Sequence, residues 1–190
     1  MNIYSEIIAA SWGVFLLVWF VGAHGVKHTA TDTYTWRRVA IRIAGLLLIV
    51  LLFSLPVINS YFRLNIMVRQ ISPLSGNIGV ALSIIGVGIA IWARIYLGRN
   101  WGAPRSLHEG HELVTSGPYR YVRHPIYTGV LLALLGAAVV QGPVWFIPFA
   151  YFVFYFIRSI RIEEGHMLER FPSEYPVYRA RTKRLVPFIY

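Results

Sequence analysis

The stretch PIYTGVLLALLGAAVVQGPVWFIPFAYFVFYFI (residues 125–157) decides the fold, because its 33 residues include no Asp, Glu, Lys or Arg. A single helix of this length would measure about 50 Å, whereas the hydrocarbon core of a bilayer is about 30 Å thick. Gly142 and Pro143 stand near the middle of the stretch and offer turn chemistry. The stretch therefore predicts a tight helical hairpin, with one helix near 125–140 and the next near 144–160.

Three further stretches without a charged residue precede the hairpin. They cover residues 7–23, 43–62 and 70–93, which is 17, 20 and 24 residues. A spanning helix needs about 20 apolar residues, so each of them predicts one crossing of the bilayer. The fold class expected is thus an all-α integral membrane protein with five transmembrane helices, the last two being the hairpin.

The composition agrees with a membrane protein. Hydrophobic residues make up 56% of the 190-residue chain and charged residues only 14%, and there is no cysteine. A soluble domain carries about 25% charged residues, so this chain has too few to cover a globular surface in water. A disordered chain, a disulfide-stapled fold and a thiolate metal site are excluded by the same figures.

The placement of the basic residues predicts the topology. With the N-terminus outside, the segments 24–42, 94–124 and 158–190 lie inside and hold 16 of the 18 Lys and Arg residues. Against 7 acidic residues this gives the inner face +9 of the chain's net charge of +10. Positive inner loops orient membrane proteins, so the basic excess indicates topology and not a nucleic-acid partner. The C-terminus and the polar segments are expected on the cytoplasmic face.

The polar mass also predicts how the chain is organised. We expect one domain over 1–190, with a three-helix membrane part over 1–93. Any chemistry is expected in 94–190, at the cytoplasmic face, where the 94–124 loop and the C-terminal segment hold the polar residues. Gly129, Ala133 and Ala137 recur at four-residue spacing, which predicts that this helix packs closely on a neighbour.

The run HELVTSGPYRYVRHPIYTG (111–129) contains a candidate anion site. Pro125 suits the first turn of a helix, where the missing N–H costs nothing. Unpaired backbone N–H groups at that helix start would lie beside Arg120, Arg123 and His124. A helix N-terminus flanked by arginines is suited to a carboxylate or a phosphate.

The same run brings three tyrosines to the same place. Tyr119, Tyr121 and Tyr127 could hold a cation against their faces or stack on a base. The alternative is that these arginines and tyrosines are ordinary residues of the inner membrane boundary, where both types gather. From composition alone, the two interpretations remain open.

The second polar run is RSIRIEEGHMLERF (158–171), in which the last helix is predicted to continue beyond the bilayer until Pro172. The buried stripe expected for this extension consists of Ile160, Met167, Leu168 and Phe171. Glu163 and Glu164 lie close to the apolar span, where a carboxylate is costly. They either pair with nearby arginines or hold a cationic ligand. A cation site beside an anion site suggests a zwitterionic ligand with an aromatic part.

A metal site is not expected. His24 and His28 flank the first inner loop, and His108 and His111 lie in a polar loop. Zinc sites usually have three or four protein ligands, and neither pair has a third nitrogen ligand at close spacing. The sequence also contains no phosphate-binding loop and no nucleophile elbow.

These two runs resemble the isoprenylcysteine carboxyl methyltransferase family, which is similar to the phospholipid N-methyltransferases. The resemblance rests on an RHPxY motif and on an EE pair about 38 residues later, within 111–129 and RIEEGHMLERFPSEYPVYRARTKRLVPFIY (161–190). The segment RIYLGRNWG (94–102) also resembles the segment before that family's cofactor loop. The resemblance implies S-adenosylmethionine as cofactor, bound at the cytoplasmic membrane face in a pocket built from the 94–124 loop and the C-terminal segment. It thereby implies that 94–190 is the cofactor-binding and catalytic part.

The resemblance also implies roles for particular residues. By position, the cofactor-binding residues would be His111, Leu113, Val114, Tyr119, His124, Pro125, Tyr127 and Glu163, with Glu164 adjacent. Arg120 and Arg123 join them from the predicted anion site. The family places an arginine before its acidic pair, toward the methyl acceptor, and here Arg158 and Arg161 bracket that position. These two are therefore the candidate catalytic residues.

The function expected is methyl transfer from S-adenosylmethionine to a lipophilic substrate that enters from the bilayer, most plausibly a carboxylate such as prenylcysteine. Alternatives are a phospholipid amine or another small lipophilic acceptor, an NADPH-dependent membrane enzyme resembling the sterol reductases, and a non-enzymatic membrane scaffold. The partners expected are the lipophilic substrate and membrane lipids, and nothing in the sequence indicates a protein partner.

Overall fold

A computed structural model describes residues 3–23, 71–98, 112–187 and 189 of the chain. All of these residues belong to one compact unit. The helix predicted at 43–62 lies outside the described residues, as do residues 99–111, which include the candidate ligand His111.

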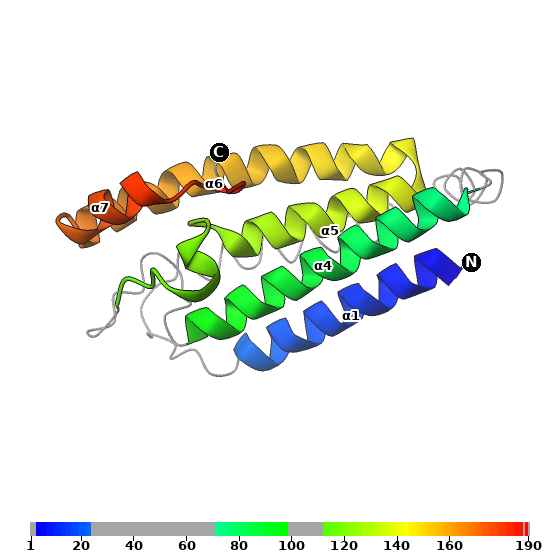
Figure 1. Ribbon diagram of the computed structural model, residues 1–190, viewed down its shortest axis with the longest axis horizontal. Helices are drawn as coiled ribbons and strands as arrows, with labels where there is room; N and C mark the ends of the chain where they lie inside the picture. The colour runs from blue at the N-terminus through cyan, green and yellow to red at the C-terminus, as the bar shows by residue number, and fades with distance from the viewer. Residues whose placement is uncertain (1–2, 24–70, 99–111, 188, 190) are drawn as a thin grey trace, which may run out of the picture. The chain divides into compact units, whose positions relative to one another are not determined.

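The described part of the chain is helical and contains no strand. Its helices are α1 (Ile3–Ala23), α4 (Pro73–Leu97), α5 (Pro125–Gln141), α6 (Phe146–Arg170) and α7 (Glu174–Arg181), with short 3-10 turns η2 (Gly117–Arg120) and η3 (Pro143–Trp145). Within this unit α4 lies between α1 and α5, and α6 packs on the other side of α5 (Figure 1).

Three of the described helices are long and apolar enough to cross a membrane, over Ile3–Val21, Pro73–Leu97 and Pro143–Arg170. The fourth long helix, α5, is apolar but has only 17 residues. These spans agree with the predicted all-α membrane architecture, and the chain is an integral membrane protein. The complete five-helix topology and the orientation of the termini stay predictions.

The predicted hairpin between α5 and α6 is present. Gly142 ends α5 with a φ of 111°, a left-handed value that favours glycine. Its N–H donates to Ala138 O at 2.9 Å, and Trp145 N–H donates back to Gly142 O at 3.0 Å. Pro143 then starts the 3-10 turn, where its missing N–H costs nothing. The chain therefore reverses within a few residues, as the Gly-Pro pair predicted.

Helices α4 and α5 approach so closely that their backbones are in contact. Gly79 and Gly86 on α4 meet Gly136 and Gly129 on α5. A Cβ atom on Gly129 would lie 2.5 Å from Gly86 O, closer than real Cβ atoms come. In the same interface the Ser83 hydroxyl donates to Ala133 O at 3.1 Å. The close packing predicted from the small residues of α5 is thus confirmed, and α4 and α5 form the rigid centre of the unit.

Helix α6 packs against the rest of the unit much less extensively than α4 and α5 pack against each other. Its buried residues are Phe156, Ile160 and Glu164, which follow each other at four-residue spacing. The predicted buried stripe was wrong at Met167, which is 38% exposed. The physical reason is that the buried residues of α6 recur every four positions, so that Glu164 follows Ile160 on the buried face and Met167 lies off it. The buried face of α6 is therefore apolar along the hairpin and acidic at its end.

Candidate functional site

The 3-10 turn η2 begins the site by fixing Tyr119. Gly117 allows this turn with a φ of 58°, in the left-handed region. Tyr119 is buried, and its hydroxyl donates to Ala93 O on α4 at 3.4 Å. The Tyr178 hydroxyl of α7 donates to Tyr119 O at 2.7 Å. Burial raises the pKa of Tyr119, so its side chain stays a neutral phenol. The two hydrogen bonds hold the residue between α4 and α7.

The C-terminal tail runs alongside the start of α5. Arg123 N–H donates to Lys183 O at 2.8 Å, and His124 N–H donates to Arg184 O at 3.0 Å. The Thr128 hydroxyl donates to Leu185 O at 2.7 Å. The two backbone N–H groups, of Arg123 and His124, lie where the sequence predicted an anion site. Both bind carbonyl groups of the tail, beside a parallel bridge that joins Val122 and Lys183.

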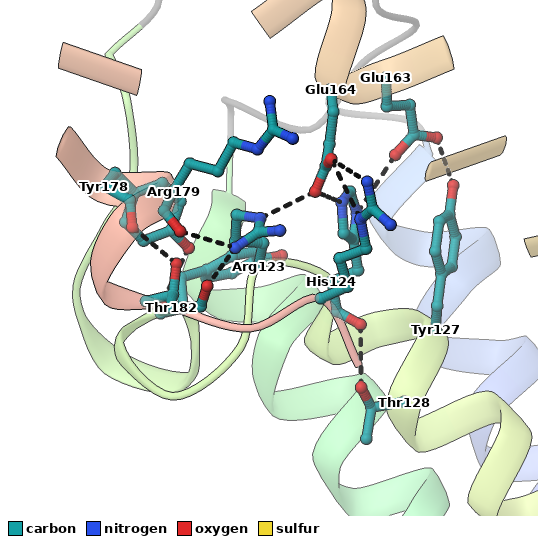
Figure 2. Close-up of polar contacts among 11 residues, drawn as sticks. Arg123, His124, Tyr127, Thr128, Glu163, Glu164, Tyr178, Arg179 and Thr182 are labelled. Atoms are coloured by element: carbon teal, nitrogen blue, oxygen red, sulfur yellow. Dashed lines mark hydrogen bonds and ion pairs between the residues drawn. The ribbon is translucent and has the colours of Figure 1, made fainter. Parts of the chain in front are cut away.

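A buried ion cluster of Arg123, Glu164 and Arg184 lies beneath this tail. Arg123 Nε donates to Glu164 Oε1 at 2.8 Å, and Arg184 reaches Glu164 Oε2 with Nη2 at 3.1 Å and Nε at 3.2 Å. The Arg123 guanidinium also donates to Arg179 O at 3.1 Å and to Thr182 O (Figure 2). The Glu164 side chain is only 5% exposed. For Glu164, pairing with arginines is the interpretation that the structure supports.

The neighbouring glutamate belongs to a different group, which we call the open cluster, of His124, Tyr127 and Glu163. The Tyr127 hydroxyl donates to Glu163 Oε1, and His124 Nδ1 lies 3.5 Å from Glu163 Oε2 (Figure 2). The Glu163 side chain is 31% exposed. Glu163 is therefore the carboxylate that remains accessible to a ligand.

His124 lies between the two clusters. Its Nε2 atom is 3.7 Å from Glu164 Oε1, which is beyond hydrogen-bond range, and has no hydrogen-bond partner among the residues that the structure describes. Burial lowers the pKa of His124, but the two nearby carboxylates outweigh burial and raise it above its usual value of 6.5. The positive form of the ring is thus favoured in the folded protein.

The raised pKa of His124 predicts how stability depends on pH. The folded state binds the proton more tightly, so the stabilisation is fully present below about pH 6.5 and is lost as the pH rises through the folded-state pKa. We expect the melting temperature in detergent to fall as the pH rises above about 6.5. In His124→Gln this decline should be much smaller, whereas His166→Gln, on α6, should keep it. An unchanged decline in His124→Gln would contradict the prediction.

Aromatic rings extend the open cluster toward the exposed side of α6. The rings of His124 and Tyr127 are stacked with centroids 5.6 Å apart, and Tyr127 stacks on Phe156 at 4.3 Å. Phe156 in turn contacts Phe152 and Tyr155, with centroids 5.8 and 5.7 Å away. An aromatic row therefore connects Glu163 with the hairpin surface, where Tyr155 is exposed.

The structure brings most of the predicted residues together but not all. The residues that meet at the start of α5 and the end of α6 are Arg123, His124, Pro125, Tyr127, Glu163 and Glu164, with Tyr119 on the adjoining turn. Leu113 and Val114 are half-buried in the segment before η2, and Arg120 is exposed. Arg123 is buried on internal partners, where the sequence predicted an arginine open to an anion.

The two candidate catalytic arginines lie elsewhere on α6. Arg158 and Arg161 are both exposed. Successive helical residues are about 100° apart, so Arg158 and Arg161 lie about 140° and about 160° around the axis from Glu163. The sequence interpretation also missed Arg184, whose contact with Glu164 depends on the path of the tail. The resemblance covered this tail, but nothing in its local pattern indicated a partner.

Comparison with known proteins places this geometry in a family. A sequence model of the phospholipid methyltransferase family matches residues 75–174. This region includes every residue of the two clusters except Arg184. Protein-S-isoprenylcysteine O-methyltransferase B of Arabidopsis thaliana is 33% identical over 117 residues, covering 60% of this chain and 59% of that protein. The cobalt-zinc-cadmium resistance protein CzcN of Cupriavidus metallidurans is 31% identical over 122 residues, covering 62% of this chain and 51% of that protein.

A fungal relative matches the chain at a similar identity over a shorter region. Protein-S-isoprenylcysteine O-methyltransferase of Schizosaccharomyces pombe is 33% identical over 84 residues, covering 43% of this chain and 36% of that protein. The matched region spans about three fifths of the first relative's length. Because the family model covers more than half of the chain, and because the paired motifs meet in one site, the chain belongs to the phospholipid methyltransferase family.

Proposed function

We propose that this chain is a membrane methyltransferase that uses S-adenosylmethionine and methylates a lipophilic acceptor. The observation that carries the proposal is the open cluster, in which the partly exposed Glu163 carboxylate lies beside the stacked rings of His124 and Tyr127. A carboxylate beside aromatic faces suits a small cation. The cofactor carries positive charge on its amino group and its sulfonium and has an aromatic base, so the residues present fit it.

The cofactor would be held by residues of this one end of the unit. Glu163 would accept from its amino group, and Tyr127, which donates to Glu163, would keep that carboxylate oriented. His124, favoured in its positive form and facing Glu163, would help to hold that carboxylate in place. When bound, the cofactor supplies the methyl group on its sulfonium. The remaining catalytic task of the protein is to hold the acceptor in line, which supplies much of the rate in such displacements.

The acceptor is proposed to be a carboxylate on a lipophilic molecule, such as prenylcysteine. The names of the plant and fungal relatives support this substrate class. A carboxylate is ionised at neutral pH and needs no general base. The aromatic row from Tyr127 through the buried Phe156 to the exposed Tyr155 would give the lipophilic part an apolar surface. A phospholipid amine is the second acceptor to test, because the family model describes phospholipid methyltransferases.

The proposal is tested by methyl transfer in a purified system. Protein in nanodiscs would receive methyl-labelled S-adenosylmethionine and one of three acceptors: a prenylcysteine analogue, the same analogue with its carboxylate amidated, or phosphatidylethanolamine. We expect label in the first product, as a base-labile ester, and none with the amidated control. Label in phosphatidylethanolamine alone would favour the phospholipid acceptor. Binding of NADPH but not of S-adenosylmethionine, measured by calorimetry, would overturn the proposal.

The exposed arginines of α6 enter this proposal on the acceptor side. Because Arg158 and Arg161 lie away from Glu163 around the helix, replacing either with Gln should leave the Kd for S-adenosylmethionine within about twofold of the parent value. A guanidinium that pairs with the acceptor carboxylate contributes about 1.5–3 kcal/mol, so its loss should lower kcat/KM at least about tenfold. Full turnover in both variants would remove these arginines from the acceptor site.

A further inference from the structure

Arg184 touches both halves of the site with different parts of the same residue. Its guanidinium binds Glu164 on α6, with Nη2 at 3.1 Å and Nε at 3.2 Å from Oε2. Its carbonyl oxygen accepts the N–H of His124, at the start of α5, at 3.0 Å. One residue of the tail therefore ties the helix that carries Glu163 to the residue that faces it.

Helix α6 needs such a tie because it packs weakly on the rest of the unit. Its buried residues are Phe156, Ile160 and Glu164, and Glu164 is the last of them. A helix held by so few residues can rotate or slide, and a small rotation at Glu164 would move the adjacent Glu163 away from Tyr127 and His124. Two guanidiniums hold Glu164 from separate segments, Arg123 on Oε1 and Arg184 on Oε2.

We propose that Arg184 is a positioning residue: by clamping Glu164 it fixes α6 against the start of α5 and keeps Glu163 and His124 in place for the ligand of the open cluster. This inference rests on the proposed function for the identity of that ligand. The Arg184 backbone contacts His124 of the open cluster, whereas the side chain acts through Glu164, its direct partner. The carbonyl group would remain in place when the side chain is changed.

The titration of His124 distinguishes a clamp from an effect of charge alone. The ring faces Glu163 and Glu164 on α6 and Tyr127 on α5, with Arg123 beside it in the chain and Tyr119 on η2 close to Glu163. Arg184 adds a positive charge to Glu164 from the tail. If Arg184 clamps α6, its loss lets both carboxylates move away from His124, and the pKa of His124 falls back toward its usual value. If α6 stays in place without Arg184, only the charge is lost, and the pKa of His124 rises further.

The tail should remain attached in the variants that test this. Backbone pairing to Lys183 O and the bond from Thr128 to Leu185 O do not involve the Arg184 side chain. Arg184→Gln removes the charge, and Arg184→Lys keeps the charge but loses the two-point contact. Arg181→Gln is the matched control, because Arg181 is an exposed arginine of the same C-terminal region.

The experiment follows two readouts in detergent. Histidine-labelled protein gives the titration of His124 by NMR, assigned by the signal that is missing from His124→Gln, and calorimetry gives the Kd for S-adenosylmethionine. We expect Arg184→Gln to lower the His124 midpoint toward the usual value and to weaken cofactor binding about tenfold. Arg184→Lys should keep the midpoint near that of the parent and recover part of the affinity. Arg181→Gln should match the parent in both.

Two results would overturn the inference. One is an Arg184→Gln protein whose His124 midpoint is unchanged or rises. The other is an Arg184→Lys protein that shifts His124 as far as Arg184→Gln does. A failure of the proposed function looks different, because then the parent does not bind S-adenosylmethionine. The titration of His124 would still report whether Arg184 acts on the cluster, since it needs no ligand.

Discussion

Glu163→Gln is expected to leave the protein folded and to abolish binding of S-adenosylmethionine, whereas Glu164→Gln is expected to destabilise the protein. Glu163 is 31% exposed and takes part in a hydrogen bond from Tyr127 that a glutamine oxygen can also accept. Its charge is therefore free for a ligand. Glu164 is 5% exposed and balances Arg123 and Arg184. A neutral amide there leaves buried guanidinium charge without a partner, which costs about 3–5 kcal/mol.

The two variants are each other's control, because they make the same chemical change at adjacent positions. Thermal unfolding in detergent should give a melting temperature for Glu163→Gln close to that of the parent, and a much lower one for Glu164→Gln. Calorimetry on the folded Glu163→Gln protein should show no binding at ligand concentrations that saturate the parent. Equal loss of stability in both variants would contradict the division of roles between the two glutamates.

This division of roles could not be predicted from the sequence. Two adjacent residues of a helix differ by about 100° around its axis, so their surroundings depend on how the helix is rotated against its neighbours. That rotation is set by Arg123, 41 residues earlier in the chain. It is also set by Arg184, which is 20 residues later. The sequence predicted a carboxylate for a cation and a carboxylate paired with arginines as alternatives. The structure pairs Glu164 with arginines and leaves Glu163 partly exposed.

Local signals predicted the parts of the fold that depend on local chemistry. The Gly142-Pro143 pair interrupts an apolar run too long for one span, and α5 and α6 meet at this point. The continuation of α6 to Arg170 followed from the absence of a helix breaker before Pro172. The parallel pairing of the tail with Val122 had no such signal, since it joins segments about 60 residues apart through backbone groups that every sequence offers.

Gly86→Ala is expected to be strongly destabilising, although alanine is the better helix former. A Cβ atom at Gly86 would lie 2.5 Å from Gly129 O and would also meet the backbone nitrogen of Ala133. Backbone atoms cannot turn aside as a side chain can, so α4 and α5 must separate. Overpacking of this kind costs about 1–3 kcal/mol, more than the roughly 1 kcal/mol that alanine gains over glycine in a helix.

Gly88→Ala is the matched control on the same helix. A Cβ atom there has nothing within 4 Å, so only the helix propensity of alanine changes and the melting temperature should stay level or rise. The separation caused at Gly86 should also reach the site, because Tyr119 binds Ala93 O on the same helix. Gly86→Ala should therefore weaken cofactor binding as well as lower the melting temperature, and Gly88→Ala should do neither. Equal melting temperatures for the two variants would contradict the backbone contact between α4 and α5.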